Sequence, residues 1–274
     1  MTCSRSLSTI VLASVVGALA LGAACSAENA KPWEKPGTKV GDEITGPDGG
    51  KMVWVPAGGF IMGSPTGEGE ADERPAHRVR ITKGFWLGRC TVTQAQYRRY
   101  CQEAAAVPPR VSATAAQGDD CPVVDVGWAE AEAYCSHYGL SLPTEAQWEY
   151  SARGPKAHKY PWGNEWDPKR CCNDPNQDSE SRPFPVGGFP QGASWCGALE
   201  MASNLWQWCN DWYSRDYYDA SPNTDPPGPH AGESRVLRGG SWRYDAYNCR
   251  SVSRFCSVVP GGSDFYGFRC SKTP

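Results

Sequence analysis

The segment that most constrains the fold is Arg235–Cys270, with the sequence RVLRGGSWRYDAYNCRSVSRFCSVVPGGSDFYGFRC. It holds three cysteines, six arginines and two glycine pairs, and neither a helical nor a strand-like period runs through it for long. A long segment without periodicity becomes ordered only when the rest of the chain holds it. Loops held in this way are frequent places for functional sites. The segment therefore predicts a loop-rich fold and is the first place to look for a site.

The composition agrees with a fold of this kind. The 274 residues include Trp 12, Tyr 12, Gly 30, Pro 23 and Cys 13, but only Met 4. Aromatic rings and cysteine bridges are therefore expected to replace part of an aliphatic core. The formal net charge of −3 provides no basic surface for a nucleic acid, so we expect no nucleic-acid partner.

Residues 1–24 have the pattern of a lipoprotein-type signal peptide. Arg5 supplies a positive charge, and the uncharged apolar run Thr9–Leu21 is too short for a stable membrane span. The ending LGAAC resembles a bacterial lipobox with its leucine one place early, so Cys25 would be the lipidated first residue. We expect an exported protein of the bacterial outer membrane or periplasm that contacts the membrane only through this lipid. Cleavage as a plain secreted protein is the alternative.

Residues 25–50 carry few apolar side chains and predict a flexible tether. No tandem repeat or second change in composition follows, so residues 51–274 are expected to form a single domain. In an exported protein most cysteines pair in disulfides. Without Cys3 and Cys25 eleven cysteines remain, and since this number is odd, at least one thiol has no partner inside the domain.

Three parts of the chain predict strands or loops. The two apolar runs of Lys51–Ser64 flank a Pro-Ala-Gly-Gly sequence and are typical of a β-hairpin. The alternating apolar residues of His77–Leu87 indicate one half-buried strand. The stretch Tyr160–Trp212 is rich in Asn, Asp, Gly, Pro and Trp and is expected to be loop.

Three helices are expected between these parts. Thr93 and Gln96 form a capping-box pattern, and so do Thr144 and Gln147. A further helix is predicted over Trp128–Tyr138, where a glycine follows the last apolar position. Short strands, a few helices and much ordered loop together predict the α+β class.

Eight motifs in order resemble the formylglycine-generating enzyme / sulfatase-modifying factor family over roughly residues 50–272. They are MVWVPAGGFIMGS, ERPAHRVRITKGFWLGRCTVTQAQY, PVVDVGWAEAEAYC, LSLPTEAQWEYSARG, YPWGNEW, ALEMASNLWQWCNDWY, RVLRGGSW and GFRC. The resemblance implies a loop-dominated variant of the C-type-lectin-like fold. It also implies an enzyme that oxidises a cysteine of a client sulfatase to formylglycine, using oxygen and a copper(I) ion held by two thiolates.

The chain departs from this family at the copper pair. The first thiolate would lie three residues after the serine of the RGGS motif, where this sequence has Tyr244, and the second would lie at Cys249. Alignment on Arg250–Arg254, which resembles the family's R-C-A-A-R motif, moves Cys249 away from the catalytic positions. Ser241 matches a serine beside the copper site, although the role expected for it here is to cap the glycine turn. Copper binding is therefore not expected, and Ser241 and Cys249 are the only catalytic candidates.

The resemblance also implies a structural calcium site. Its ligands would be the side chains of Glu200 and Gln207 and the backbone carbonyls of Ser203 and Leu205, oxygen donors of the kind that Ca²⁺ prefers. A turn held only by hydrogen bonds is the alternative.

Two further features follow from the resemblance alone. A second calcium site would use Asn173 and Asp178, in a loop that is shorter than in the oxidases. A disulfide would join Cys135 to Cys270.

Two functions remain open at this stage. The first is a lipoprotein without oxidase activity, a calcium-stabilised binding or scaffold module of the cell envelope. It would hold a protein or glycan on the aromatic stretches Trp206–Tyr218 and Tyr244–Tyr247. The second is an active or diverged formylglycine-generating oxidase that modifies a client sulfatase.

Overall fold

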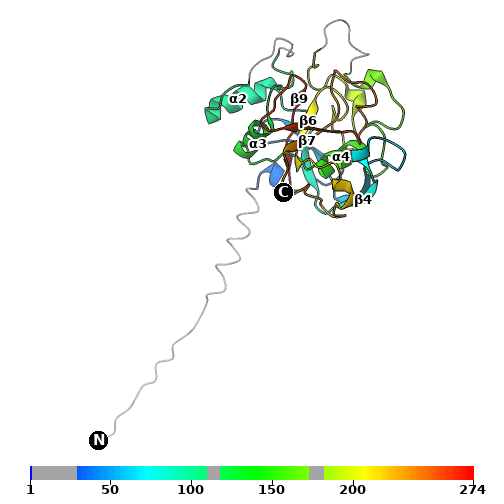
Figure 1. The fold of residues 1–274 in the computed structure, drawn as a ribbon. Coiled ribbons are helices and arrows are strands. Elements are labelled where there is room, and N and C mark those ends of the chain that lie inside the picture. Colours follow the sequence, from blue (N-terminus) through cyan, green and yellow to red (C-terminus); the bar gives the residue numbers. More distant parts are fainter. Residues whose placement is uncertain (2–29, 110–117, 173–181) are drawn as a thin grey trace.

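The computed structural model describes Met1 and residues 30–109, 118–172 and 182–274. Figure 1 shows short strands and a few helices joined by much ordered loop in one body. This arrangement confirms the predicted α+β class and the single loop-rich domain. None of the helices in these ranges is long and apolar enough to cross a bilayer.

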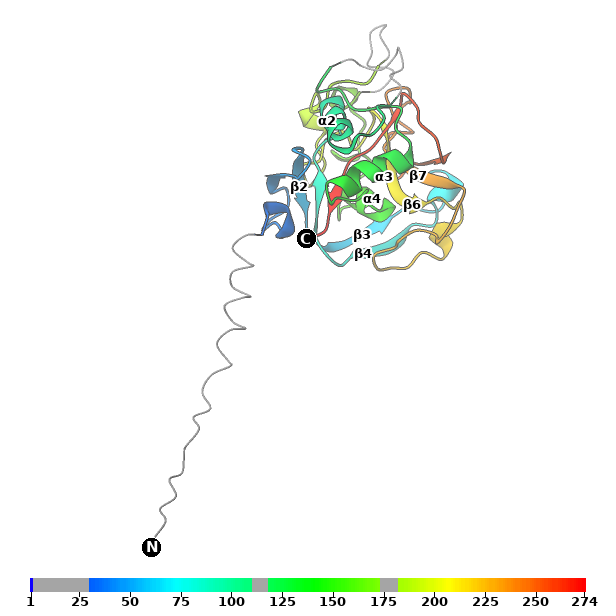
Figure 2. The same ribbon diagram turned by 90° about the vertical axis from the view of Figure 1, so that its left-hand side faces the viewer.

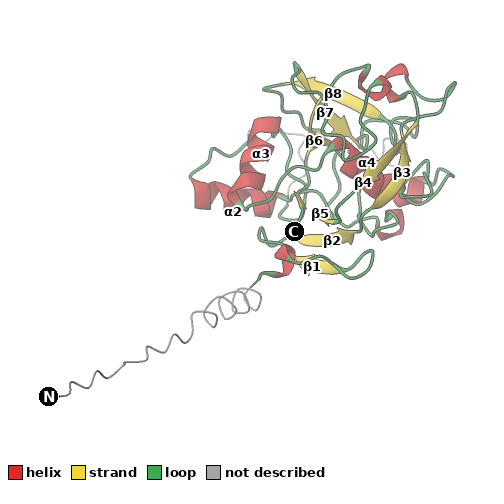
Figure 3. Ribbon diagram, turned by 90° about the horizontal axis from the view of Figure 1, so that it is seen from below, coloured by secondary structure: helices red, strands yellow, loops and turns green. Residues whose placement is uncertain are grey.

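The first sheet contains both the earliest and the latest strands of the described chain. It consists of β1 (Glu43–Thr45), β2 (Lys51–Val55), β5 (Phe85–Gly88) and β10 (Ser271–Lys272), in this order and all antiparallel. Seen from below, β1, β2 and β5 lie side by side near the C-terminus (Figure 3). The two ends of the described domain are therefore joined in one sheet.

This sheet corrects the predicted boundary between tether and domain. Within the predicted tether, β1 pairs with β2, and Trp33 of the short helix η1 (Pro32–Glu34) packs against the core. The N–H of Gly41 also donates to the carbonyl of Trp54 at 3.0 Å. Residues 30–50 thus belong to the folded body, because their backbone completes the edge of the first sheet.

A second sheet pairs β3 (Gly58–Met62) with β4 (His77–Ile81), antiparallel. The predicted hairpin in Lys51–Ser64 is therefore wrong: β2 already has β1 and β5 on its two edges, so β3 pairs elsewhere. The single strand predicted over His77–Leu87 is also divided between two sheets. The chain turns between β4 and β5, where the N–H of Thr82 donates to the side chain of Asp225 at 2.9 Å.

Three strands of the third sheet come from the segment around Arg235–Cys270. It has the order β8 (Arg254–Val258), β7 (Ser234–Arg238), β6 (Trp206–Trp212) and β9 (Tyr266–Gly267), and only β6 and β9 are parallel. Strand β6 lies in the stretch predicted to be loop. Five of its seven residues are buried, so the alternation that marks a half-exposed strand is missing from the sequence.

The helices form where the sequence predicts them. They are α2 (Gln94–Ala104), α3 (Trp128–His137) and α4 (Glu145–Arg153), with further 3₁₀ turns at Ala71–Glu73, Pro168–Arg170, Pro190–Gly192 and Tyr217–Asp219. The side chains of Thr93 and Thr144 each accept a hydrogen bond from the backbone N–H of the glutamine three residues on, at 3.3 and 3.1 Å. The side-chain oxygen of each glutamine in turn accepts a hydrogen bond from the backbone N–H of the threonine. Helix α4 contacts β6 and β7, and Figure 2 shows it beside these strands. Both capping boxes are confirmed.

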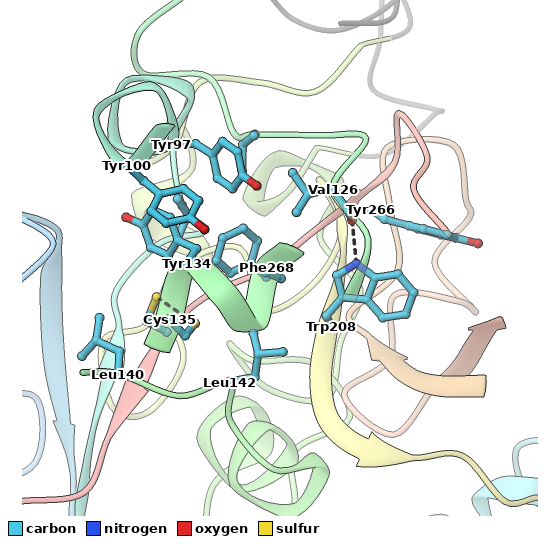
Figure 4. Packing of buried hydrophobic residues seen from close by; sticks show 14 of the residues in the cluster. Tyr97, Tyr100, Val126, Tyr134, Cys135, Leu140, Leu142, Trp208, Tyr266 and Phe268 are labelled. Carbon is cyan, nitrogen blue, oxygen red and sulfur yellow. Dashed lines mark hydrogen bonds between the residues drawn. The ribbon is translucent and has the colours of Figure 1, made fainter. Parts of the chain in front are cut away.

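An aromatic core lies between α2, α3 and the third sheet (Figure 4). The rings of Tyr97 and Tyr134 stack with their centroids 5.7 Å apart, and Phe268 meets Tyr134 edge-on at 5.2 Å. The indole N–H of Trp208 donates to the carbonyl of Val126 at 2.9 Å. Rings thus fill much of the space that aliphatic side chains fill in other domains, as the composition predicted.

Candidate functional site

The RGGS turn follows β7 directly, and its backbone requires glycine. Gly240 has a φ of +76°, and a Cβ atom there would lie 2.9 Å from the Sγ atom of Cys249. Ser241 is fully buried, and its hydroxyl oxygen accepts a hydrogen bond from the N–H of Arg243 at 3.3 Å. This contact is a turn-capping hydrogen bond, the ordinary role of a serine at such a position.

Tyr244 occupies the position at which the resemblance implies the first copper ligand. Its half-buried ring meets Trp206 edge-on with centroids 5.8 Å apart, and Phe265 at 6.2 Å. Trp206 in turn stacks on Phe255 at 5.2 Å. This position therefore contributes apolar ring contacts to the site and offers no metal-binding sulfur.

Cys249 has no exposed surface. Burial raises the pKa of its thiol to about 12, and the negative charge of Asp245 adds to the effect. Cys172 also contributes, and Cys249 in turn raises the pKa of Cys171, so the fold brings these three cysteines near one another. At neutral pH the Cys249 side chain is a neutral thiol, a poor nucleophile and metal ligand. No local signal in the sequence links it to Cys171 and Cys172.

Three buried ion pairs hold the segment around this turn. Each joins a carboxylate of α4 or of the 3₁₀ turn Ala71–Glu73 to an arginine between positions 238 and 254. The pairs are Glu145–Arg254, Glu149–Arg238 and Glu73–Arg250. Arg254 contacts Glu145 through Nε at 2.7 Å and Nη2 at 3.0 Å. Removing one partner of such a pair costs about 3–5 kcal/mol, so these pairs explain how a segment without periodicity stays ordered.

A further buried carboxyl, Asp211 on β6, lies beside these pairs. Its Oδ2 accepts a hydrogen bond from the backbone N–H of Glu145 at 2.8 Å. Burial, followed by the negative charge of Glu145, raises the pKa of Asp211 from 3.8 to about 8. The Asp211 carboxyl is therefore mostly protonated at neutral pH, unlike a surface aspartate.

The four residues of the first predicted calcium site lie in the turn before β6 and at the start of that strand. Glu200, Ser203 and Asn204 have positive φ values of 56°, 71° and 64°, which cost of order 1 kcal/mol each and persist only where the surroundings hold them. The Glu200 carboxylate accepts hydrogen bonds from the N–H of Gly187 at 2.5 Å and from the N–H and hydroxyl of Thr91 at 3.4 Å. Burial raises the pKa of this carboxyl above its ordinary value.

Gln207 is the second residue of β6, and its side chain is fully buried. Its Oε1 accepts hydrogen bonds from the indole N–H of Trp148 at 2.8 Å and from Nε of Arg269 at 2.6 Å. Its Nε2 donates to the carbonyl of Glu200 at 2.6 Å and more weakly to the carbonyl of Leu205 at 3.4 Å. Each atom of the amide therefore has two partners.

Arg269, which donates to the side chain of Gln207, has no exposed surface. Its Nη1 donates to the carbonyls of Gly88 at 2.8 Å and Arg89 at 3.1 Å. Its Nη2 donates to the carbonyls of Leu199 at 2.7 Å and Glu200 at 3.2 Å. One guanidinium thus joins the end of β5 to the turn before β6.

Residues 40–274 match the family model of the sulfatase-modifying factor enzyme 1-like domain. The chain belongs to this family. The match includes β1 and so agrees with the corrected start of the domain.

Known members of the sulfatase-modifying factor family align with most of the chain. The formylglycine-generating enzyme of Streptomyces coelicolor is 32% identical, over 81% of this chain and 88% of its own length. The mouse protein named inactive C-alpha-formylglycine-generating enzyme 2 is 29% identical, over 81% of this chain and 85% of its own length. Other curated relatives are longer, and the chain spans 38% of the length of some of them.

A solved structure supports the same fold. The structure of PvdO from Pseudomonas aeruginosa superimposes with a TM-score of 0.77 and 25% sequence identity, covering 87% of this chain and all of PvdO.

The residues of this family member do not fit a copper(I) ion held by two thiolates. Position 244 has a tyrosine, and the Cys249 thiol is buried with a raised pKa. Among the described residues, no group of three His, Cys, Asp or Glu side chains is arranged to hold a metal ion. The site keeps the family's RGGS turn, with a tyrosine at the position of the first copper ligand and a fully buried thiol at Cys249.

The first predicted calcium site does not fit its ion either. The fold brings its four residues together, but N–H donors engage their oxygens. The carbonyl of Ser203 accepts from the N–H of Leu205 at 3.0 Å, and the carbonyl of Leu205 faces Nε2 of Gln207. A different N–H donor therefore points at each of the four oxygens that the resemblance assigns to the cation.

Asn173, Asp178 and Cys25 lie outside the described residues. The Sγ atoms of Cys135 and Cys270 lie 3.5 Å apart, a hydrogen-bond distance for two thiols, so the disulfide stays a prediction.

Proposed function

We propose that this member of the sulfatase-modifying factor family does not generate formylglycine and acts as a binding or scaffold module of a bacterial cell envelope. The observation that carries the proposal is the ring of Tyr244, packed against Trp206 where the resemblance implies a copper thiolate. The buried neutral thiol of Cys249 supports it, because a thiol with a pKa of about 12 is a poor copper ligand at neutral pH. One of the matched relatives also carries the word "inactive" in its name.

The loop around Tyr244 and Tyr247 is the surface that best supports binding. The sequence also pointed to Trp206–Tyr218, but Trp206, Trp208 and Tyr218 are buried in the core. Tyr247, in contrast, is 46% exposed. Its ring lies under the guanidinium of Arg250, 3.9 Å from the ring centroid, and its hydroxyl donates to Glu70 at 2.9 Å. An exposed ring held so firmly loses little entropy when it contacts a glycan or a protein.

The test combines copper titration with an oxidation assay. The purified protein is titrated with copper(I) against a competing chelator, and a peptide with a sulfatase-type cysteine is incubated with the protein, copper and oxygen. We expect no copper binding beyond that of a Cys249→Ser variant and no mass change in the peptide. A formylglycine product that is lost in Cys249→Ser would establish the alternative, an active oxidase.

A separate measurement tests the binding role. Immobilised glycans and envelope proteins are probed with the wild-type protein and with Tyr247→Ala, which removes the exposed ring and its contacts with Arg250 and Glu70. We expect a glycan or protein ligand whose binding is weakened at least about tenfold by the substitution, as for a central aromatic contact. If no ligand is retained, or if the variant binds every ligand equally well, the proposed surface is wrong.

A further inference from the structure

Several buried carbonyl oxygens meet at the turn before β6. Those of Leu199, Glu200 and Leu205 face one small region, and none of them is paired there within a regular strand ladder. Buried carbonyl oxygens need either N–H donors or a cation, because an unpaired one costs free energy. The resemblance implies a cation that the Leu205 carbonyl and the side chain of residue 207 would help to bind here, whereas the described contacts supply N–H groups.

The side chain of residue 207 decides between these two solutions. Trp148 Nε1 and Arg269 Nε can only donate, and both point at Oε1 of Gln207, at 2.8 and 2.6 Å. Rotating the amide by half a turn would place its NH₂ group against these donors and its oxygen against the Glu200 carbonyl. The two donors therefore fix Nε2 toward the carbonyls.

Arg269 adds a permanent positive charge to the same place. Its two terminal nitrogens donate to four carbonyls, which join the turn to the end of β5. The guanidinium also lies close enough to Glu200 to favour the charged form of that carboxylate. Since arginine does not lose its proton in proteins, this charge is present at every accessible pH.

We propose that the amide of Gln207, in a turn that Arg269 also holds, takes the place of a calcium ion, so that this turn is stable without the metal. The side chain at position 207 then determines whether this turn needs a bound cation. A glutamate has the same shape but would present an oxygen to the Glu200 and Leu205 carbonyls. Three facing oxygens require a cation, and Ca²⁺ accepts carboxylate and carbonyl ligands together.

The experiment measures thermal unfolding of the full-length protein in EDTA and in millimolar calcium. An Asp178→Ala background removes the second calcium site that the resemblance implies. Gln207→Glu is introduced into this background, and the exposed Gln191→Glu provides the same change of charge away from the turn. Magnesium in place of calcium tests for a general effect of divalent ions.

We expect the Asp178→Ala protein and its Gln191→Glu control to unfold at the same temperature in both buffers. The Gln207→Glu protein should unfold at least roughly 5 °C lower in EDTA and regain most of this loss in calcium but not in magnesium. A parent protein that EDTA destabilises would overturn the proposal, because its turn would then depend on the ion. If calcium does not raise the unfolding temperature of the Gln207→Glu protein, the role of residue 207 is wrong. The same holds if this variant does not fold even in calcium.

Discussion

Asp211 should make the stability of this protein fall as the pH rises, and Asp211→Asn should remove this dependence. The pKa of the Asp211 carboxyl is about 8 in the folded protein, against an ordinary value of 3.8 that applies to the unfolded chain. Between these values the folded state binds a proton that the unfolded state does not. The contribution to stability is therefore complete below about pH 4 and is lost as the pH rises to 8.

The difference of about four pH units corresponds to about 6 kcal/mol at about 1.4 kcal/mol per unit. Since domains are stable by only about 5–15 kcal/mol, such a loss is large. An asparagine keeps an oxygen for the N–H of Glu145 but does not ionise. The advantage of Asp211→Asn over the wild type should therefore grow by about 1.4 kcal/mol per pH unit between pH 5 and pH 7, and level off above pH 8.

Urea unfolding followed by tryptophan fluorescence from pH 5 to pH 9 measures this difference. Comparing Asp211→Asn with the wild type at each pH cancels the contributions that other groups make to stability. One such group is Glu145, whose lowered pKa makes stability rise with pH. Asp219→Asn, at an exposed position, is the matched control and should leave the pH dependence unchanged. A gap between Asp211→Asn and wild type that stays constant from pH 5 to pH 9 would refute the reasoning.

Two further predictions concern cysteines. In protein isolated under oxidising conditions, mass mapping after alkylation should find Cys135 joined to Cys270. Cys270→Ser should then lower the free energy of unfolding by about 2–5 kcal/mol. Recovery of both residues in alkylated form would contradict the bridge. Metabolic labelling with a fatty-acid analogue should mark the wild-type protein and not Cys25→Ser, and equal labelling of the two would exclude a lipid anchor at this residue.

The sequence predicted those parts of the fold that depend on local contacts. The capping boxes at Thr93 and Thr144 need only residues within one helical turn, and both are present. The strands were harder, because their partners lie far away in the chain. Strand β2 resembles half of a hairpin with β3, yet it pairs with β1 and β5, and β6 is too buried to show alternation.

The candidate site shows the same division. Counting residues from the RGGS motif was enough to find Tyr244 at the position of a copper ligand. The donors that occupy the predicted calcium site could not be found in this way. Trp148 and Arg269 lie 59 and 62 residues from Gln207 in sequence, and nothing near Gln207 indicates that they meet it.

The contacts of Arg269 also have a consequence for the order in which the chain folds. This residue and its partner Gly88 are 181 positions apart, and β10, which closes the first sheet beside β5, follows Arg269 directly. A growing chain that emerges N-terminus first therefore exposes β1, β2 and β5 with one edge of β5 unpaired. Closing so long a loop costs entropy before any contact compensates for it. The N-terminal strands must consequently wait for the segment that contains β10, and the domain reaches its native state only after translation has passed residue 272.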